Sequence, residues 1–129
     1  MNILRNRLIL CASVVIFIAG VLGPSIAMAV AKGIYITSGT ARSTKTMKYL
    51  IKRSKATGIN TFVIDVYGRN KKYSKNIAMV KQAGIRYVAR VVVFPYGARH
   101  HQVKSRKIWE KRWKWAKYAV SLGADAIQL

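Results

Sequence analysis

Few folds can accommodate the run Thr61-Phe62-Val63-Ile64-Asp65-Val66, which lies near the middle of this chain. Five of its six residues are β-branched or aromatic, and such side chains fit a packed, pleated surface. The run shows almost no polar alternation, which is typical of a strand buried on both faces of a parallel sheet. An unpaired carboxylate inside such a strand costs on the order of several kcal/mol. We therefore expect Asp65 either to be paired with a cation or to be used in function.

Strand-like and helix-like segments alternate from Lys32 to the end of the chain. Each predicted helix begins at a serine that can cap its N-terminus and ends at a glycine. We predict strands over residues 33–37, 61–66, 86–94 and 124–129, and helices that begin at Ser43, Ser74 and Ser105 and end at Gly58, Gly84 and Gly123. The order βαβαβαβ is typical of a parallel α/β sheet with right-handed crossovers.

A short repeat links each predicted helix to the next strand. Each copy has a glycine, one apolar residue and one polar residue, as in Gly58-Ile59-Asn60, Gly84-Ile85-Arg86 and Gly123-Ala124-Asp125. Helix-to-strand loops this short are typical of parallel α/β folds. Four strands fall short of an eight-stranded barrel, which needs about 250 residues. The pattern alone therefore leaves open a complete small sheet and an incomplete barrel.

The spacing of apolar residues predicts which face of each helix packs on the sheet. We expect the inward residues to be Met47, Leu50 and Ile51 in the first helix, Ile77, Val80 and Ala83 in the second, and Trp109, Trp113, Ala116 and Val120 in the third. Trp115 falls outside the last of these stripes. Glu110 is expected in the first turn of the third helix, where a carboxylate interacts favourably with the helix dipole.

Residues 1–31 have the pattern of a secretory leader. Arg5 and Arg7 form a basic start, an uncharged apolar run follows over residues 8–22, and Pro24 interrupts it. Small residues over 27–31 then offer a cleavage site. An uncleaved membrane anchor is the alternative, because residues 8–31 carry no charge and about 20 apolar residues can span a bilayer. Either way we expect the domain of residues 32–129 to be exported, as a periplasmic, secreted or inner-membrane-anchored protein.

The charge of the chain is strongly unbalanced, with 24 Lys and Arg against 3 Asp and Glu and a formal net charge of +21. A field of this sign attracts polyanions. Because an exported chain meets little nucleic acid, we expect an anionic envelope polymer or a lipid surface as the partner, and not nucleic acid. The basic segment 104–118, with Trp109, Trp113 and Trp115, could supply such a surface. The alternative is that these tryptophans pack on the sheet.

Asp65 and Arg90 lie near the ends of two neighbouring predicted strands. Ligands of parallel α/β folds bind at the carboxyl ends of the strands, where Thr37, Phe94 and Gln128 are the expected neighbours of Asp65. A buried guanidinium needs an acceptor and favours a carboxylate, so we expect Asp65 and Arg90 to form an ion pair. Two roles for Asp65 stay open: a structural ion pair, and a catalytic or sugar-binding carboxylate.

Other chemistries find little support in the sequence. Glu110 in a surface helix and Asp125 at the start of the fourth strand are both placed away from this rim, so the second carboxylate needed for glycoside hydrolysis is missing. His100 and His101 are adjacent and have no third ligand, so no metal site is expected. The only cysteine, Cys11, lies in the leader, and there is no glycine-rich phosphate loop, so no cofactor is expected.

Four sequence blocks, found in the right order, resemble a bacterial family of glycoside hydrolase-like domains that are (β/α)8 barrels distantly related to α-amylases. The blocks are Lys32-Gly33-Ile34-Tyr35-Ile36-Thr37, Gly58-Ile59-Asn60-Thr61-Phe62-Val63-Ile64-Asp65-Val66, Tyr87-Val88-Ala89-Arg90-Val91-Val92-Val93-Phe94 and Leu122-Gly123-Ala124-Asp125-Ala126-Ile127-Gln128-Leu129. The resemblance covers residues 32–129 and implies the first four strands of a (β/α)8 (TIM) barrel. Strands five to eight, and the aspartate that follows the Gln128-Leu129 position in that family, are absent here.

The resemblance implies hydrolysis of O-glycosidic bonds by carboxylates at the barrel mouth. On this basis Asp65 is the candidate catalytic residue, and a carbohydrate is the expected ligand of Tyr35, Thr37, Arg90, Phe94 and Gln128. Because the second carboxylate is missing, we expect a truncated domain without turnover of its own. The alternative is a non-enzymatic basic envelope protein that binds an anionic glycan or a membrane surface. The open edges of a half-barrel sheet also predict a homo-oligomer.

Overall fold

The computed structural model describes residues 30–129, which include the whole of the predicted domain. The predicted leader or anchor lies outside the described residues, except for Val30 and Ala31, which belong to no helix or strand. No helix in the described part is both long enough and apolar enough to cross a membrane.

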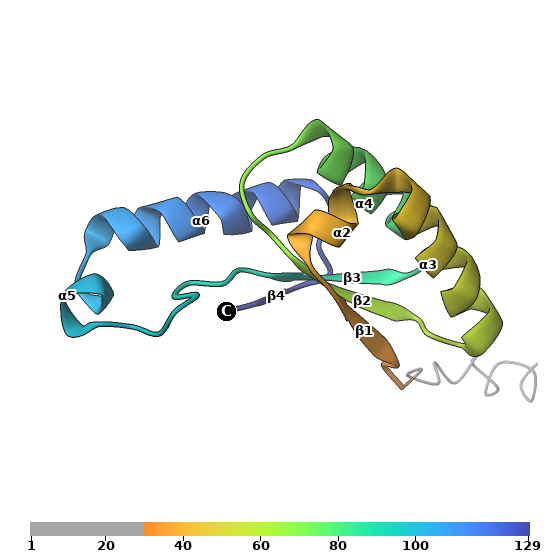
Figure 1. Cartoon of the computed structure of the whole chain (residues 1–129), viewed down its shortest axis with the longest axis horizontal. Coiled ribbons are helices and arrows are strands. Elements are labelled where there is room, and N and C mark those ends of the chain that lie inside the picture. The colour runs from red at the N-terminus through yellow and green to blue at the C-terminus, as the bar shows by residue number, and fades with distance from the viewer. Residues whose placement is uncertain (1–29) are drawn as a thin grey trace, which may run out of the picture. The chain divides into compact units, whose positions relative to one another are not determined.

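The domain is built on a four-stranded parallel sheet with the strand order β1-β2-β3-β4 (Figure 1). The strands are β1 (Gly33–Ile36), β2 (Thr61–Asp65), β3 (Arg86–Arg90) and β4 (Ala126–Gln128). The helices are α2 (Ser38–Arg42), α3 (Thr44–Thr57), α4 (Lys71–Gln82), α5 (His100–Val103) and α6 (Arg106–Ser121). The predicted parallel α/β sheet is confirmed. The strands are shorter than predicted, and the short helices α2 and α5 were not predicted.

Helices α2, α3, α4 and α6 lie on one face of the sheet, and the other face is bare within the described residues (Figure 1). In β2, Phe62 and Ile64 are fully buried beneath the helices, whereas Val63 and Asp65 are only partly buried. Because successive strand residues point to opposite faces, this alternation marks a sheet with one covered side. The prediction that β2 is buried on both faces is therefore wrong. Crossovers of one hand that always step in the same direction place their helices on the same side of the sheet, which explains the arrangement.

Three glycines end the main helices at the positions where the repeat predicted them. Gly58, Gly84 and Gly123 have φ angles of 72°, 74° and 80°, in a left-handed region that glycine enters without the steric strain of a side chain. Two residues after each glycine the chain is already at the start of the next strand or one residue before it. The repeat is therefore the loop chemistry that turns each helix back into the sheet.

The helix starts were predicted less accurately. Ser43 is confirmed as the N-cap of α3, with its Oγ accepting from the Thr46 amide at 3.3 Å. Helix α4 begins earlier than the predicted Ser74, because Asn70 is its N-cap and accepts from the Tyr73 amide at 3.0 Å. Asparagine caps a helix as well as serine does. Ser105 does precede α6, although its side chain makes no capping hydrogen bond.

Helix α6 buries a face that differs from the predicted one, although Ala116 is buried as predicted. Its buried residues are Trp115, Ala116, Tyr118 and Ala119. Trp113 and Val120, both predicted to point inward, are 63% and 60% exposed. The helix carries large apolar residues on two faces, and spacing alone does not decide which of them meets the core. Trp115, which falls outside the predicted inward stripe, packs against Tyr67 with the ring centroids 4.8 Å apart.

A buried amide fixes α4 against the helices that follow β1. Asn76 is fully buried, its Nδ2 donates to the carbonyl of Ala41 at 2.8 Å, and its Oδ1 accepts from the Thr44 hydroxyl at 2.9 Å. A buried amide whose groups are bonded avoids most of the penalty of leaving water. The segments around α2, the start of α3 and α4 are therefore held in a defined geometry.

Candidate functional site

Three side chains meet near the carboxyl ends of the strands, on the bare face of the sheet. These residues, Tyr35, Asp65 and Arg90, come from β1, β2 and β3 and are called the rim cluster below. The Tyr35 hydroxyl donates to Oδ2 of Asp65, and Nη1 of Arg90 donates to Oδ1 at 3.3 Å. The Arg90 guanidinium also lies 5.1 Å from the centroid of the Tyr35 ring. The carboxylate is therefore shared between a phenol and a guanidinium.

The register of the sheet explains why these residues meet. Asp65 lies opposite Arg90 in the β2–β3 pairing, so both side chains leave the sheet on the same face. Tyr35 lies opposite Val63, which is on that face two residues before Asp65. The long side chain of Tyr35 spans these two residues, so that its hydroxyl reaches the Asp65 carboxylate.

The predicted ion pair between Asp65 and Arg90 is present, but it is not a buried one. The side chain of Asp65 is 17% exposed and that of Arg90 is 37% exposed. Their contact is one long hydrogen bond, whereas a guanidinium binds a carboxylate most strongly through two. Ion pairs with this much solvent contact contribute little to stability. The pairing therefore leaves room for a second role of Asp65.

Hydrogen bonding to Asp65 raises the pKa of Tyr35 above its ordinary value of 10.0. Loss of solvent contact and the negative charge of Asp65 act in the same direction, while Arg90 opposes them. The phenol consequently stays protonated at physiological pH. It remains a hydrogen-bond donor that holds the Asp65 carboxylate in place.

The rim cluster has groups that suit a polyhydroxylated ligand. A carboxylate accepts hydrogen bonds from hydroxyl groups, and a guanidinium donates them to hydroxyl or ring oxygens. Tyr35 is 52% exposed, and its aromatic ring offers apolar contact area beside a polar tip.

The other predicted ligand-binding residues have different surroundings. Thr37 is the N-cap of α2, where its Oγ1 accepts from the Thr40 amide at 3.3 Å. Phe94 follows the end of β3 and packs edge-on against Trp109, with the ring centroids 5.6 Å apart. Gln128 lies opposite Arg90 in the β3–β4 pairing, which places its exposed side chain on the face of the rim cluster. Of these residues, Gln128 is the one that the register places in the same row as Asp65 and Arg90.

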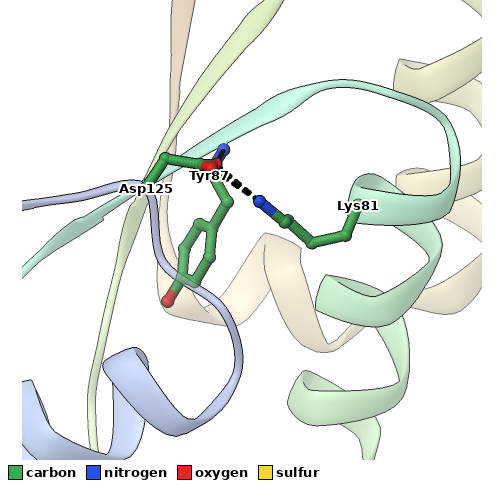
Figure 2. A network of polar contacts seen from close by, with 3 residues as sticks. All are labelled: Lys81, Tyr87 and Asp125. Atoms are coloured by element: carbon green, nitrogen blue, oxygen red, sulfur yellow. Dashed lines mark hydrogen bonds and ion pairs between the residues drawn. The ribbon is translucent and has the colours of Figure 1, made fainter.

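Asp125 lies just before β4, at the end of the sheet opposite the rim cluster, as predicted. Both of its carboxylate oxygens are hydrogen-bonded there (Figure 2). Its two carboxylate oxygens accept from Nζ of Lys81 at 2.7 and 2.8 Å, and Oδ2 also accepts from the Tyr87 amide at 2.7 Å. Burial raises the pKa of this carboxyl, but the hydrogen bonds from Lys81 and the Tyr87 amide outweigh it. The pKa therefore lies below its usual value.

Glu110 is not in the first turn of α6, contrary to the prediction, and it does not serve as a helix-dipole partner there. It pairs instead with Arg106, four residues earlier, at 2.7 Å on the exposed side of the helix. The rim cluster thus holds one carboxylate of the three in the described domain. The described residues contain no group of three histidine, cysteine, aspartate or glutamate side chains that could hold a metal ion.

An apolar groove of about 940 Å³ runs between α6 and the end of β4. It is lined mainly by Val93, Trp109, Trp113, Ala116, Val120, Ile127 and Leu129. Several of the residues that were predicted to pack inward from α6 are therefore the wall of an open surface. The edge of β4 beside it has no further strand among the described residues.

Two features of the site were not predicted from the sequence. The contact of Tyr35 with Asp65 could be inferred only once the register between β1 and β2 was known, because the two residues are 30 positions apart. Helix α2 was missed, although Thr37 stands at a capping position before Ser38, Gly39 and Thr40. A capping residue at the end of a predicted strand was the available signal.

Comparisons with known proteins establish a fold likeness. Neither the models of known protein families nor the sequences of curated proteins match this chain. A crystal structure of a hypothetical protein from Ruminiclostridium thermocellum ATCC 27405 superposes with a TM-score of 0.57 and 19% sequence identity. The alignment covers 73% of this chain and 73% of that chain. At this identity the likeness shows a shared fold alone.

Proposed function

We propose that this domain is the first half of a glycoside hydrolase-like (β/α)8 barrel and that its rim cluster binds carbohydrate. The proposal is carried by one observation, the bare face of a parallel sheet that presents Asp65 at the carboxyl ends of its strands. In this proposal Asp65 is the carboxylate that the first half contributes to the site. Tyr35 and Arg90 hold it in place through their hydrogen bonds.

The sheet topology supports the barrel half. A doubly wound sheet reverses its direction of winding and carries helices on both faces, whereas a barrel winds in one direction with its helices outside. The order β1-β2-β3-β4 contains no reversal. The bare face would then become the barrel interior. Its middle row consists of Tyr35, Val63, Val88 and Ala126, and branched apolar side chains are typical of such interiors.

The same geometry argues against turnover by this domain alone. Glycoside hydrolysis generally needs two carboxyl groups that flank the scissile bond, about 5–5.5 Å apart for retention and about 6.5–9.5 Å apart for inversion. Asp125 is bound at the other end of the sheet and Glu110 lies on the exposed side of α6. In the proposed barrel, the second carboxylate would have to come from the other half.

The proposal is tested by measuring carbohydrate binding calorimetrically with the full chain and a panel of neutral oligosaccharides, since neutral ligands do not respond to the net charge. We expect the Asp65→Asn variant to bind about tenfold more weakly, because a charge-assisted hydrogen bond becomes a neutral one. Glu110→Gln is the matched control, since it removes one carboxylate charge away from the rim. We also expect the unmodified full chain to release no more reducing sugar from these oligosaccharides than the Asp65→Asn variant does.

The proposal fails if none of the neutral oligosaccharides binds, or if Asp65→Asn and Glu110→Gln bind them equally well. Release of reducing sugar by the full chain but not by Asp65→Asn would contradict the expected lack of turnover. It would leave the assignment of Asp65 to the site intact.

A basic protein that binds an anionic glycan or membrane surface is the second candidate. It is favoured by the exposed side of α6, where Trp113 is 63% exposed and the ammonium of Lys117 lies 5.7 Å from its ring centroid. Aromatic rings beside cations suit the boundary between lipid headgroups and acyl chains. Vesicles with and without anionic lipid test this candidate over a salt series. We expect binding to anionic vesicles only, weakened by salt and by Trp113→Ser more than by Tyr49→Ser.

A further inference from the structure

A shallow, basic pocket of about 720 Å³ lies apart from the rim cluster, among the segments that follow β1 and β2. Its lining residues are Gly39, Arg42, Ser43, Arg69, Asn70, Lys71 and Lys72. Four of these seven residues are cations and none is an acid. These residues belong to α2 and its C-cap, to the loop that leads from β2 into α4, and to the start of α4.

The four cations of this pocket have no acidic partner among the described residues. The three carboxylates in this part of the chain pair with Lys81, Arg90 and Arg106 instead. In addition, Nε of Arg42 is buried and has no acceptor within the described structure. A buried donor without an acceptor is costly, and a cluster of like charges in a concavity concentrates a positive field. An anion bound among these cations would neutralise the positive field.

The walls of the pocket are held in place by contacts with neutral groups of the domain, which leave its positive charges without a compensating anion. Nη2 of Arg42 donates to the carbonyl of Tyr67 at 3.1 Å, which ties α2 to the β2–α4 loop. The guanidinium of Arg69 lies 5.7 Å from the ring centroid of Tyr118. The Tyr118 hydroxyl donates to the carbonyl of Asn70 at 3.3 Å, and Asn76 joins α4 to α2. The pocket is therefore built before any ligand arrives.

The start of α4 adds to the positive field. Asn70 is its N-cap, and the first turn contains Lys71 and Lys72 and no acidic residue. The N-terminus of a helix carries a partial positive charge that favours anions. In many helices an acidic residue in the first turn offsets this charge. In α4 two lysines stand there instead and add to the positive charge, so this end of the helix attracts an external anion.

We propose that this pocket binds a phosphoryl group, a compact tetrahedral dianion, through Arg42, Arg69, Lys71 and Lys72. Guanidinium and ammonium groups are the usual protein partners of phosphate oxygens. The position fits the general rule for parallel α/β folds, in which ligands bind beyond the carboxyl ends of the strands. The proposed site is independent of the carbohydrate site at Asp65, because it shares no residue with the rim cluster.

The proposal is tested by calorimetric titration of the full chain with inorganic phosphate and with pyrophosphate, at an ionic strength held constant with chloride. The triple variant Arg69→Gln/Lys71→Gln/Lys72→Gln removes three exposed cations of the pocket and keeps Arg42, which supports the loop. The matched control Lys48→Gln/Lys52→Gln/Arg53→Gln removes three exposed cations from α3 and gives the same net charge. We expect the pocket variant to bind about tenfold more weakly and the control to change by less than about twofold.

Equal losses in the two triple variants would overturn the proposal, because binding would then follow the net charge. Absence of phosphate binding by the unmodified chain would also overturn it. If circular dichroism shows that the pocket triple variant is unfolded, the double variants Lys71→Gln/Lys72→Gln and Lys48→Gln/Lys52→Gln replace the pocket and control triples. Equal losses of binding in the two double variants would again overturn the proposal.

A second arm distinguishes the source of the phosphoryl group. Vesicles of phosphatidylcholine with phosphatidic acid present a phosphomonoester, and vesicles with phosphatidylglycerol carry charge as phosphodiesters only. A pocket-dependent preference for phosphatidic acid vesicles indicates a lipid headgroup. Pocket-dependent binding of pyrophosphate without such a preference indicates a soluble phosphorylated ligand.

Discussion

The three carboxylates of the described domain have different environments, and these environments separate their roles. Glu110 bonds one exposed arginine on α6 and lies largely in solvent. Asp125 accepts three hydrogen bonds at the amino end of the sheet. Asp65 accepts hydrogen bonds from the phenol of Tyr35 and the guanidinium of Arg90 on the bare face of the sheet. Of the three, only Asp65 combines fixed orientation with a place at the carboxyl ends of the strands, where ligands of such folds bind.

Replacement of Asp125 by asparagine is expected to lower the free energy of unfolding by about 1–2 kcal/mol at pH 7. The variant loses the ion pair with Lys81, and it weakens the hydrogen bond from the Tyr87 amide. The loss stays small because about a third of the Asp125 side chain is exposed and solvent screens its charge. Urea denaturation measures the difference, with Glu110→Gln as a control that should stay within about 0.5 kcal/mol of the unmodified chain.

The effect of Asp125→Asn should also depend on pH. Because the pKa of Asp125 is lower in the folded chain than in the unfolded chain, its stabilising contribution is complete above the unfolded pKa of about 3.9. That contribution is lost as the pH falls through the folded pKa. The gap between the two proteins should therefore be constant from pH 5 to pH 7 and close below about pH 4. A gap of unchanged size at the lowest pH would contradict the role of the charged carboxylate.

At the scale of elements, α6 is the segment in which the structure departs most from its sequence pattern. The helix buries Trp115, Tyr118 and Ala119 against the sheet and exposes Trp113 and Val120. The guanidinium of Arg112 lies 4.2 Å from the ring centroid of Trp115, and its Nε donates to the carbonyl of Val93 at 3.1 Å. The buried face is thus anchored to the segment after β3, and the other apolar face lines the groove beside β4.

This orientation of α6 predicts unequal effects of two tryptophan substitutions. Trp115→Ala should lower the free energy of unfolding by about 3 kcal/mol or more, because it leaves a cavity in a packed region. Trp113→Ala should cost less than about 1 kcal/mol, because the side chain is mostly in solvent. Urea denaturation at low protein concentration measures both without a contribution from self-association. A larger loss for Trp113→Ala would mean that α6 packs with the face that the sequence pattern predicted.

The whole domain leaves three adjoining surfaces without a covering element among the described residues. They are the bare face of the sheet, the edge of β4, and the apolar groove between α6 and β4. A parallel sheet is normally covered on both faces, and an open strand edge is a template for pairing with another chain. These surfaces are available to the second half of the proposed barrel or to a second copy of the chain.

We accordingly predict that the full chain self-associates through the groove, more strongly at high salt than at low salt. Salt screens the repulsion between chains with a formal net charge of +21, while burial of apolar surface is not weakened by it. Sedimentation velocity over a salt series measures the assembly. Val120→Lys, in the groove, should shift the protein towards the monomer, and Tyr49→Lys, on an exposed position of α3, should not. A monomer at every salt concentration would contradict the prediction.

Much of the fold was determined by local sequence. The strand run with Phe62 and Ile64, the cap at Ser43 and the glycines at 58, 84 and 123 each specify a conformation through interactions within a few residues. These signals are sufficient for the order of strands and helices and for a parallel sheet. The place of Asp65 at the end of its strand, and its pairing with Arg90 in the next strand, also follow from this order.

Only the tertiary structure decided which surfaces meet. The buried face of α6 is the one that meets partners distant in sequence, since Trp115 packs against Tyr67 and Tyr118 against Tyr73. The hydroxyl of Tyr35 bonds to Asp65 because the register between β1 and β2 places both residues on one face of the sheet. The basic pocket likewise joins Arg42 to residues 69–72, which follow a different strand. Local patterns carry no information on such contacts, because the residues concerned are brought together by chain segments that are distant in sequence.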